Sequence, residues 1–351
     1  MSTLTFILPF LLLYLVVVVY AERKISAFMQ DRLGPMEVGY YGTLQTIADL
    51  LKLLQKEDIV PRGAQAVLFK AAPLVIFISV FLGFSVIPLS PVWPGAGINS
   101  GVFFLLAIIS LDVLGILVAG WSSANKYSSL GSFRAVAQII SYEVPLVLSV
   151  LCVVMCCQTL DLQEISVQQG LMGSNEKFLL GTRWLSVDTL GGFLNWNIFQ
   201  MPFLIPAWVI FFIASLAESN RAPFDLPEAE SEIVAGFHTE YSGFRWAIVA
   251  LAEYAMMLLM SMLGVVLFFG SWNTPFLNIG EFHLADWTTG PSWGVFWIVA
   301  KALFFTAVQI WVRWTFPRVR IDQLMSLGWK YLTPASLILI IISGLWKLWI
   351  S

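Results

Sequence analysis

The feature that most constrains this sequence is a series of eight apolar runs, each long enough to cross a lipid bilayer as a helix. A span needs about 20 apolar residues, and its backbone amides must be satisfied within the segment because hydrocarbon offers them no partner. None of the runs alternates apolar and polar residues as a membrane strand does. The sequence therefore predicts an all-α integral membrane protein, a bundle of about eight transmembrane helices forming one polytopic domain, residues 1–351. The predicted spans are residues 3–21, 70–89, 101–120, 135–157, 199–217, 247–270, 293–313 and 332–350.

Composition supports this class and excludes others. Charged residues make up 12% of the chain and hydrophobic residues 58%, whereas a soluble domain carries about 25% charged residues. The net charge is −3, with no block of bases, so nucleic acid is not an expected partner. Cys152, Cys156 and Cys157 share one apolar run, where we interpret them as small hydrophobic side chains. The N-terminal run has no basic residues before it and no A-x-A site, so we expect it to remain as a span.

The distribution of Lys and Arg predicts the orientation. The first, third, fifth and seventh loops hold 15 of these residues, and the second, fourth and sixth hold 2. Cytoplasmic loops carry the excess of positive charge. We therefore expect the odd-numbered loops on the cytoplasmic side of the cell (inner) membrane, and both termini on the other side.

The first loop, residues 21–69, contains an amphipathic segment over residues 42–57. Its apolar residues Leu44, Ile47, Leu51 and Leu54 recur at helical spacing, and polar residues, among them Asp49, occupy the other side. The segment is too short to span, and such a helix is suited to lying in the membrane interface. A surface helix that only tethers the loop is the alternative.

The fifth loop, residues 218–246, is unusually acidic. It opens with "ESNRAPFDLPEAESEI", in which Arg221 is the only base. The acids of this stretch are Glu218, Asp225, Glu228, Glu230 and Glu232. Close carboxylates titrate as a unit, so the loop is a candidate proton relay or electrostatic switch. A divalent-cation site is the alternative, although Pro223 and Pro227 interrupt the segment and it lacks the glycine-centred spacing of a calcium loop.

Five charged residues are predicted within spans or at their ends: Asp112, Glu143, Glu218, Glu253 and Lys301. Ionisable groups are costly in hydrocarbon and mark ion or proton pathways. This predicts a buried proton route. The alternative is that each residue fixes helix packing, with Asp112 and Lys301 as a structural pair.

Several cofactor signatures are missing from the sequence. It contains no G-x-G-x-x-G dinucleotide motif and no Walker loop. Its two histidines, His238 and His283, fall in different loops, where we expect both to be solvated. We therefore expect no metal site and no tightly bound redox centre in this chain.

Three stretches are identified by their resemblance to a known family. They are "AERKISAFMQDRLGPMEVGYYGTLQTIADLLKLLQKED" (Ala21 to Asp58), "SFRAVAQIISYEVPL" (Ser132 to Leu146) and "ASLAESNRAPFDLPEAESEIVAGFHTEYSGFRWA" (Ala214 to Ala247). They resemble the H subunit family of proton-pumping NADH:quinone oxidoreductase, the equivalent of subunit 1 of mitochondrial respiratory complex I. The resemblance covers nearly the whole chain apart from the fourth and sixth loops.

The resemblance implies a membrane subunit that forms the quinone access path and chamber at the junction with the peripheral arm. It implies quinone as substrate, with flavin and iron–sulfur clusters held by partner subunits. The expected partners are the peripheral-arm subunits of the quinone site, small membrane-arm subunits and membrane lipid. The implied quinone-path and chamber residues are Arg23, Arg32, Asp49, Lys52, Arg221 and Asp225. The implied proton-relay residues are Glu143, Glu218, Glu228, Glu230, Glu232 and Glu253.

Other functions remain as alternatives at this point. They are an autonomous cation- or proton-coupled secondary transporter, a structural anchor for a soluble redox arm, and the equivalent subunit of a membrane-bound hydrogenase-type complex. The quinone type, the electron donor of the whole complex, the pumping stoichiometry and bacterial or organellar origin are not encoded in any motif that we recognise.

Overall fold

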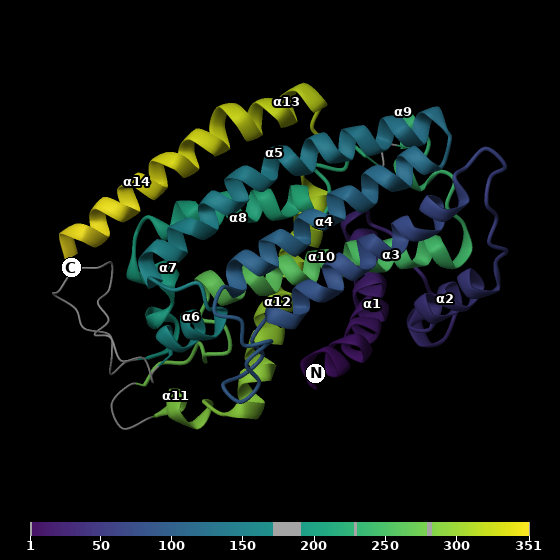
Figure 1. Ribbon diagram of the computed structural model, residues 1–351. Helices are drawn as coiled ribbons and strands as arrows, with labels where there is room; N and C mark the ends of the chain where they lie inside the picture. The colour runs from purple at the N-terminus through teal and green to yellow at the C-terminus, as the bar shows by residue number, and fades with distance from the viewer. Residues whose placement is uncertain (1, 171–190, 228–229, 279–282, 351) are drawn as a thin grey trace.

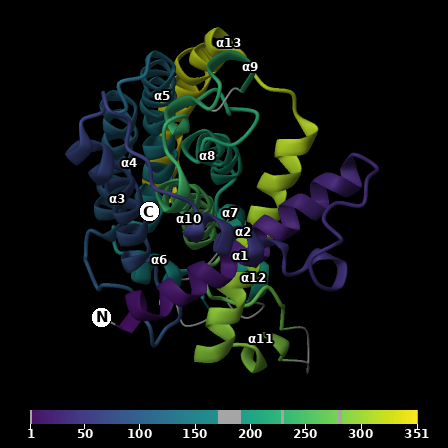
Figure 2. The ribbon, with the colours of Figure 1, turned by 90° about the vertical axis from the view of Figure 1, so that its right-hand side faces the viewer.

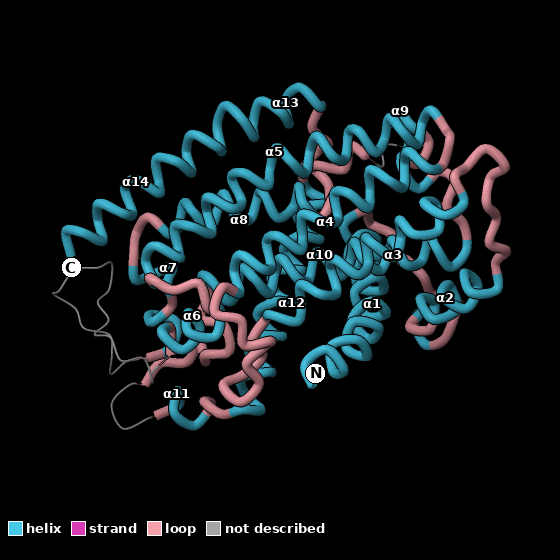
Figure 3. Tube along the Cα trace, in the orientation of Figure 1, coloured by secondary structure: helices cyan, strands magenta, loops and turns pink. Residues whose placement is uncertain are grey.

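The computed structural model describes residues 2–170, 191–227, 230–278 and 283–350. Within these ranges the chain forms helices joined by loops, and Figure 3 shows no strand among them. The predicted all-α class is confirmed for this part of the protein.

Six helical stretches are long and apolar enough to cross a membrane. Their most apolar windows have mean hydropathies from 1.6 to 2.8. They are α3 with η2 (Ala66–Val86), α4 (Gly101–Ser122), α5 (Lys126–Cys157), α10 (Gly243–Phe268), α12 (Pro291–Thr315) and the continuous stretch of α13, η6 and α14 (Ile321–Leu348). Each coincides with a predicted span, and the chain is a multi-pass membrane protein.

The other two predicted spans correspond to α1 (Ser2–Met29) and α8 (Leu204–Glu218). Helix α1 has 28 residues and carries Glu22, Arg23 and Lys24 near its C-terminal end. Helix α8 has only 15 residues, because extended backbone at Met201, directly before Pro202, separates it from the short helix α7 (Asn197–Gln200). Full crossing by α1 and α8 stays a prediction.

Helix α10 forms the centre of the bundle. Of its apolar window, 83% is buried within the chain, against 28% for α12 and 17% for the C-terminal stretch. It packs against α3, α8 and α12. Helices α5 and α14 run side by side along one edge (Figure 1), and α1 crosses α12 obliquely on one side of the bundle (Figure 2). The peripheral helices therefore leave much of their apolar surface for lipid or partner subunits.

Shorter elements occupy the loops. They are η1 (Tyr40–Gly42), α2 (Gln45–Gln55), α6 (Leu162–Gln168), η4 (Gly192–Asn195), α9 (Glu230–Ile233), η5 (Gly236–His238), α11 (Leu284–Trp287) and, within the C-terminal stretch, the π-helix η6 (Leu327–Leu332). Helix α2 lies at one end of the molecule and contacts α1 and α10 (Figure 1). Leu44, Ile47, Leu51 and Leu54, in or just before this helix, are exposed. This apolar stripe therefore has no cover within the described chain.

Lys301 holds the end of α10. Its ammonium donates to the carbonyl oxygens of Phe269, Ser271 and Asn273 at 2.8, 3.1 and 2.6 Å. An ammonium has three N–H donors, and the carbonyls beyond a helix C-terminus attract cations. Since all three donors are used there, the predicted alternative of a pair between Asp112 and Lys301 is wrong.

Candidate functional site

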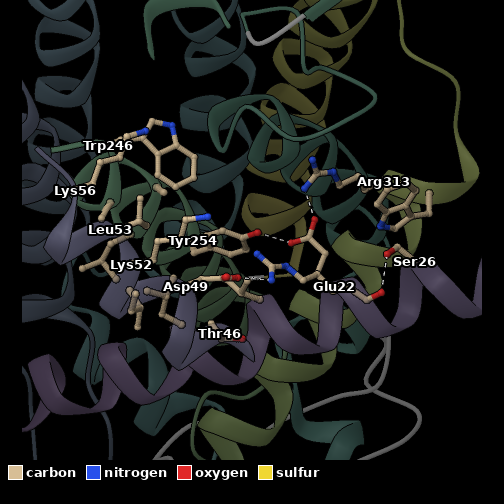
Figure 4. Close-up of a pocket in the computed structure, with 18 of the residues that line it drawn as sticks. Glu22, Ser26, Thr46, Asp49, Lys52, Leu53, Lys56, Trp246, Tyr254 and Arg313 are labelled. Carbon is tan, nitrogen blue, oxygen red and sulfur yellow. Dashed lines mark hydrogen bonds and ion pairs between the residues drawn. The ribbon is translucent and has the colours of Figure 1, made fainter. Parts of the chain in front are cut away.

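A cavity of about 660 Å³ lies between α1, α2, α10 and α12. Figure 4 shows the side chains that line it. Apolar residues, including Leu15, Leu50, Leu53 and Trp246, form much of its wall, while charged side chains from α1, α2 and α12 project into it. The cavity combines an apolar wall with localised charge.

The four path residues predicted in the first loop and its flanks all line this cavity. They are Arg23, Arg32, Asp49 and Lys52. Arg23 Nη1 lies 2.5 Å from Asp49 Oδ2, which joins α1 to α2. Gln45 Nε2 donates to Asp49 Oδ1 at 3.0 Å. Helical periodicity places Asp49 and Lys52 on the same side of α2, and the ion pair turns that side toward α1.

Lys24 fixes the segment that follows α1. Its Nζ donates to the carbonyl oxygens of Leu33 at 3.2 Å and Pro35 at 2.7 Å. Gly42 has φ +77°, and a Cβ there would lie 2.3 Å from the Pro35 carbonyl oxygen, so only glycine fits. Lys24 and Gly42 therefore shape the segment that carries Arg32.

Glu22 forms a buried charged centre at one side of the cavity. Its carboxylate accepts a hydrogen bond from the Tyr254 hydroxyl at 2.7 Å and pairs with Arg313 (Figure 4). Arg221 Nη1 lies 3.6 Å from Glu22 Oε1, and the guanidinium of Arg221 stacks over the Tyr254 ring at 4.1 Å. A buried carboxylate needs such partners, because an unpaired charge in this environment is costly.

Asp225 lies apart from the lining of this cavity. Its Oδ2 accepts from Arg318 Nη2 at 3.2 Å, in the segment that follows α12. The Val319 amide also donates to the Pro223 carbonyl at 3.1 Å. Of the two residues predicted for the chamber, the structure brings Arg221 next to the cavity and ties Asp225 to the segment between α12 and α13.

A second, much smaller cavity lies between α4, α8 and α10. Asp112, Glu218 and Glu253 line it together with Asn220. Its volume is about 10 Å³, roughly the room that one water molecule needs. Asp112 Oδ1 and Glu218 Oε2 are buried and accept no hydrogen bond from the described residues. We call this site the acid cavity.

Glu143 reaches the neighbourhood of the acid cavity through α4. It accepts a hydrogen bond from Ser110, two residues before Asp112. Asp112, Glu218 and Glu253 therefore share one buried cavity, and Glu143 is tied to the helix that carries Asp112.

The later acids of the fifth loop are placed differently. Glu232 is exposed and lies 2.5 Å from Arg134 Nη1, so it does not line the acid cavity. Glu228 lies outside the described residues, and Glu230 is described only as the first backbone position of α9. The divalent-cation alternative is not supported, because Asp225 and Glu232 pair with different arginines instead of converging. In the described chain no group of three or more His, Cys, Asp and Glu residues could hold a metal ion.

Comparison with known proteins identifies the family. A family model described as NADH dehydrogenase matches residues 1–344. The NADH-quinone oxidoreductase H subunit 2 of Cytophaga hutchinsonii is 58% identical over 364 residues, covering 100% of both chains. The chain belongs to the H subunit family of NADH-quinone oxidoreductase. The H subunit of Chlorobium luteolum is 51% identical, covering 95% of this chain and 84% of its own, and that of Bacillus cytotoxicus is 45% identical, covering 94% and 88%.

Membership of the H subunit family confirms the resemblance found in the sequence. The chain is a membrane component of NADH-quinone oxidoreductase, respiratory complex I, and its partners are other subunits of that complex. These comparisons identify neither a family of autonomous transporters nor a hydrogenase-type family.

The prediction that both histidines are solvated is wrong for one of them. His238 is buried, and its Nε2 lies 3.0 Å from Glu253 Oε1. The reason is that η5 folds inward against α4 and α5, so this part of the loop is not at the surface. His283 is exposed, as expected, and pairs with Asp286.

Glu22 and Arg313 are site residues that sequence reasoning did not include. They are 291 positions apart, so no local spacing could pair them. The available signal was that each ends an apolar run, where an ionisable group is unusual.

Tyr241 closes the fifth loop against α3. Its ring stacks on Phe69 with centroids 4.2 Å apart, and its hydroxyl donates to the Phe69 carbonyl oxygen at 3.2 Å. Burial raises the pKa of Tyr241 to about 12. The hydroxyl therefore stays protonated and keeps this hydrogen bond throughout the neutral pH range.

Proposed function

We propose that the 660 Å³ cavity is the access path and chamber for quinone in this member of the H subunit family. A quinone joins an apolar tail to a polar head, and ligand sites for such molecules are mostly apolar with a few placed polar groups. The apolar wall formed by α1, α2 and α10 suits the tail. The cluster of Glu22, Tyr254 and Arg313 suits the head.

The residues of this chain would bind and orient the substrate. Arginine carries five N–H donors, so Arg313 is suited to hold a quinone oxygen while it pairs with Glu22, whose carboxylate already accepts the single hydrogen bond that Tyr254 can donate. Electrons would arrive from flavin and iron–sulfur clusters of partner subunits. Reduction takes up two protons, and the paired charges around Glu22 would respond to that uptake.

The proposal that this chamber is coupled to a proton relay rests on four consecutive residues, 218–221. Arg221 contacts Glu22 at the large cavity, while Glu218, Ser219 and Asn220 line the acid cavity. Gln138 Nε2 fixes this turn by donating to the Ala217 carbonyl at 2.9 Å and to Asn220 Oδ1 at 3.2 Å. A change of charge at Glu22, beside Arg221, would therefore act on Glu218 through one turn of backbone.

The proposed relay runs from this turn into the membrane. Glu218, Asp112 and Glu253 surround room for about one water, and Glu143 contacts α4 at Ser110, two residues from Asp112. Coupled carboxyl groups exchange protons when water or another carboxyl is within reach. Glu228, Glu230 and Glu232 of the fifth loop, residues 218–246, would pass protons to this cavity. Quinone reduction would thereby drive proton translocation.

The proposed arrangement in the membrane follows from charge. The odd-numbered loops would face the cytoplasm because they hold 15 Lys and Arg residues against 2 in the even-numbered loops. Two of them, the first loop (21–69) and the fifth, flank the large cavity. The exposed apolar stripe along α2 would then meet lipid or the peripheral-arm subunits of the quinone site.

A photoreactive quinone analogue bound to the intact complex tests the access path. Peptide mapping should find label on α1, α2, α10 and α12 at residues lining the cavity, and excess unlabelled quinone should remove it. Label confined to other helices of this chain would overturn the proposed path. The outer surface of α14 is the internal control, because lipid-phase labelling there should not respond to the competitor.

A further inference from the structure

His238 is a buried ionisable group that the relay described above does not use. It is 7% exposed. Its Nε2 lies 3.0 Å from Glu253 Oε1, and its ring lies against Phe237 with centroids 3.8 Å apart. Both Phe237 and Glu253 line the acid cavity. The imidazole is therefore in contact with two walls of that cavity.

We propose that His238 is a proton-carrying member of the acid cavity, exchanging a proton with Glu253 across their hydrogen bond. In one state the imidazolium donates Nε2–H to the Glu253 carboxylate. In the other state the proton sits on Glu253, which donates it to Nε2 of the neutral imidazole. Only a proton changes position, so the step needs no oxidant or other reactant. The inference rests on the relay proposed above.

The composition of the cavity explains why a histidine matters here. Asp112, Glu218 and Glu253 line it, and neither Lys nor Arg is among its described lining residues. An unperturbed imidazole titrates at about pH 6.5, which makes it the side chain that gains a positive charge near neutral pH. His238 supplies a base beside acids that would otherwise hold only negative or neutral states.

The surroundings of η5 show which other groups act on the imidazole. Glu253 makes the direct contact. Other ionisable side chains lie on the elements packed around η5 and on the walls of the acid cavity. They are Asp112 on α4, Lys126, Tyr127, Arg134, Tyr142 and Glu143 on α5, Glu218 on α8, and Arg245 and Tyr254 on α10. Arg134 pairs with Glu232 and Arg245 with Asp58, so their charges are engaged elsewhere.

Backbone packing holds the imidazole in place. A Cβ at Gly131 of α5 would lie 2.7 Å from the Gly236 Cα, so η5 packs directly on the α5 backbone. Ser128 Oγ donates to the Phe237 carbonyl at 3.3 Å. The fifth loop therefore delivers His238 to the cavity on a fixed segment, which connects the surface acids of that loop to Glu253.

The test is His238→Gln in the intact complex, assayed in inside-out membrane vesicles. Glutamine keeps an N–H donor for Glu253 but does not gain a proton. NADH oxidation by a water-soluble acceptor reports assembly, and NADH:quinone turnover with proton uptake is followed between about pH 5.5 and 8. His283→Gln is the matched control, because His283 is exposed and pairs with Asp286. Glu253→Gln is made in parallel.

The expected result is a loss of about tenfold in coupled turnover at pH 7 for His238→Gln, less than the roughly 10²–10⁴-fold of a catalytic acid or base, because the acids of the cavity remain. The remaining rate should also depend less on pH than that of the wild type, and His283→Gln should match the wild type. A fall by the same factor at every pH would mean a structural role and overturn the inference. If the complex with His238→Gln fails to assemble, the pH dependence of turnover is measured for His238→Asn instead.

The parallel variant separates the two proposals. If Glu253→Gln is impaired while His238→Gln keeps the wild-type pH profile, the inference about His238 is wrong and the proposed relay is retained. Normal turnover and proton uptake in Glu253→Gln would remove Glu253 from the relay, and with it the basis for His238.

Discussion

The two cavities of this protein differ in size and in how they treat charge. The large one, about 660 Å³, surrounds a carboxylate that two arginines neutralise. The acid cavity, about 10 Å³, gathers three carboxyl groups with no Lys or Arg among its described lining residues. A roomy site in which the buried carboxylate is paired with arginines suits the binding of a neutral molecule. Like charges in a closed site suit the storage of protons, because protonation is the way such groups relieve their repulsion.

The contrast also shows where the two sites meet. Arg221 contacts Glu22 in the lining of the first cavity, Glu218 lines the second, and only Ser219 and Asn220 separate Arg221 from Glu218 along the chain. The following changes are designed to damage one site, the other, or the outer wall of the first.

Arg221→Met should have the largest effect. It leaves Glu22 with Arg313 alone, and removing one partner of a buried ion pair costs about 3–5 kcal/mol. We expect NADH:quinone turnover to fall about a hundredfold or more, while oxidation of NADH by a water-soluble acceptor persists in assembled complex. Arg62→Met, at an exposed arginine of the first loop, is the control. Wild-type quinone turnover in Arg221→Met would break the link between the charge balance at Glu22 and the large cavity.

Glu218→Gln should have an intermediate effect of a different kind. It removes an ionisable group of the acid cavity while keeping its shape, so proton uptake per quinone reduced should fall toward the two protons that the reduction itself consumes. The maximal rate should fall about tenfold, less than the roughly 10²–10⁴-fold of a catalytic acid or base, because the other acids of the cavity remain. The apparent KM for quinone should change little, because Glu218 does not line the large cavity. Glu164→Gln, at an exposed glutamate, is the control. A raised KM with normal proton uptake would mean that the two cavities are not functionally distinct.

Asp49→Asn should have the smallest effect. Asp49 and Arg23 are partly exposed, with side-chain exposures of 34% and 44%, and such pairs contribute about 1 kcal/mol or less. We expect a rise of about threefold in the apparent KM for quinone with an unchanged maximal rate. Asp322→Asn, exposed at the start of α13, serves as the comparison. A fall in proton uptake per turnover would place Asp49 in the coupling machinery instead of the cavity wall.

Sequence reasoning located the spans because the bilayer imposes one simple rule on them. Six predicted segments match helices that are long and apolar enough to cross. Helix α8 is shorter than its predicted segment because Pro202, near the start of that segment, separates α8 from the short helix before it. Proximity along the chain likewise brought Arg23, Asp49 and Lys52 to one cavity, since α1 and α2 are consecutive elements.

Contacts between distant helices were beyond that reasoning. Glu22 meets Arg313, and His238 turns inward to Glu253, through packing that no local period specifies. The contact of Lys301 with the carbonyl oxygens beyond α10 was likewise not among the roles considered for it in the sequence. The ionisable residues could be read from the sequence, but which of them face each other depends on how the helices pack.

The capping of α10 by Lys301 has an electrical consequence. From Ala255 to Phe268 the helix carries Ser261 as its only polar side chain, a length of about 20 Å. The cation beyond it has all its donors committed to carbonyl oxygens. This half of α10 therefore offers a crossing ion no side-chain ligand apart from the Ser261 hydroxyl. The helix adds here to the apolar layer across which a membrane potential falls.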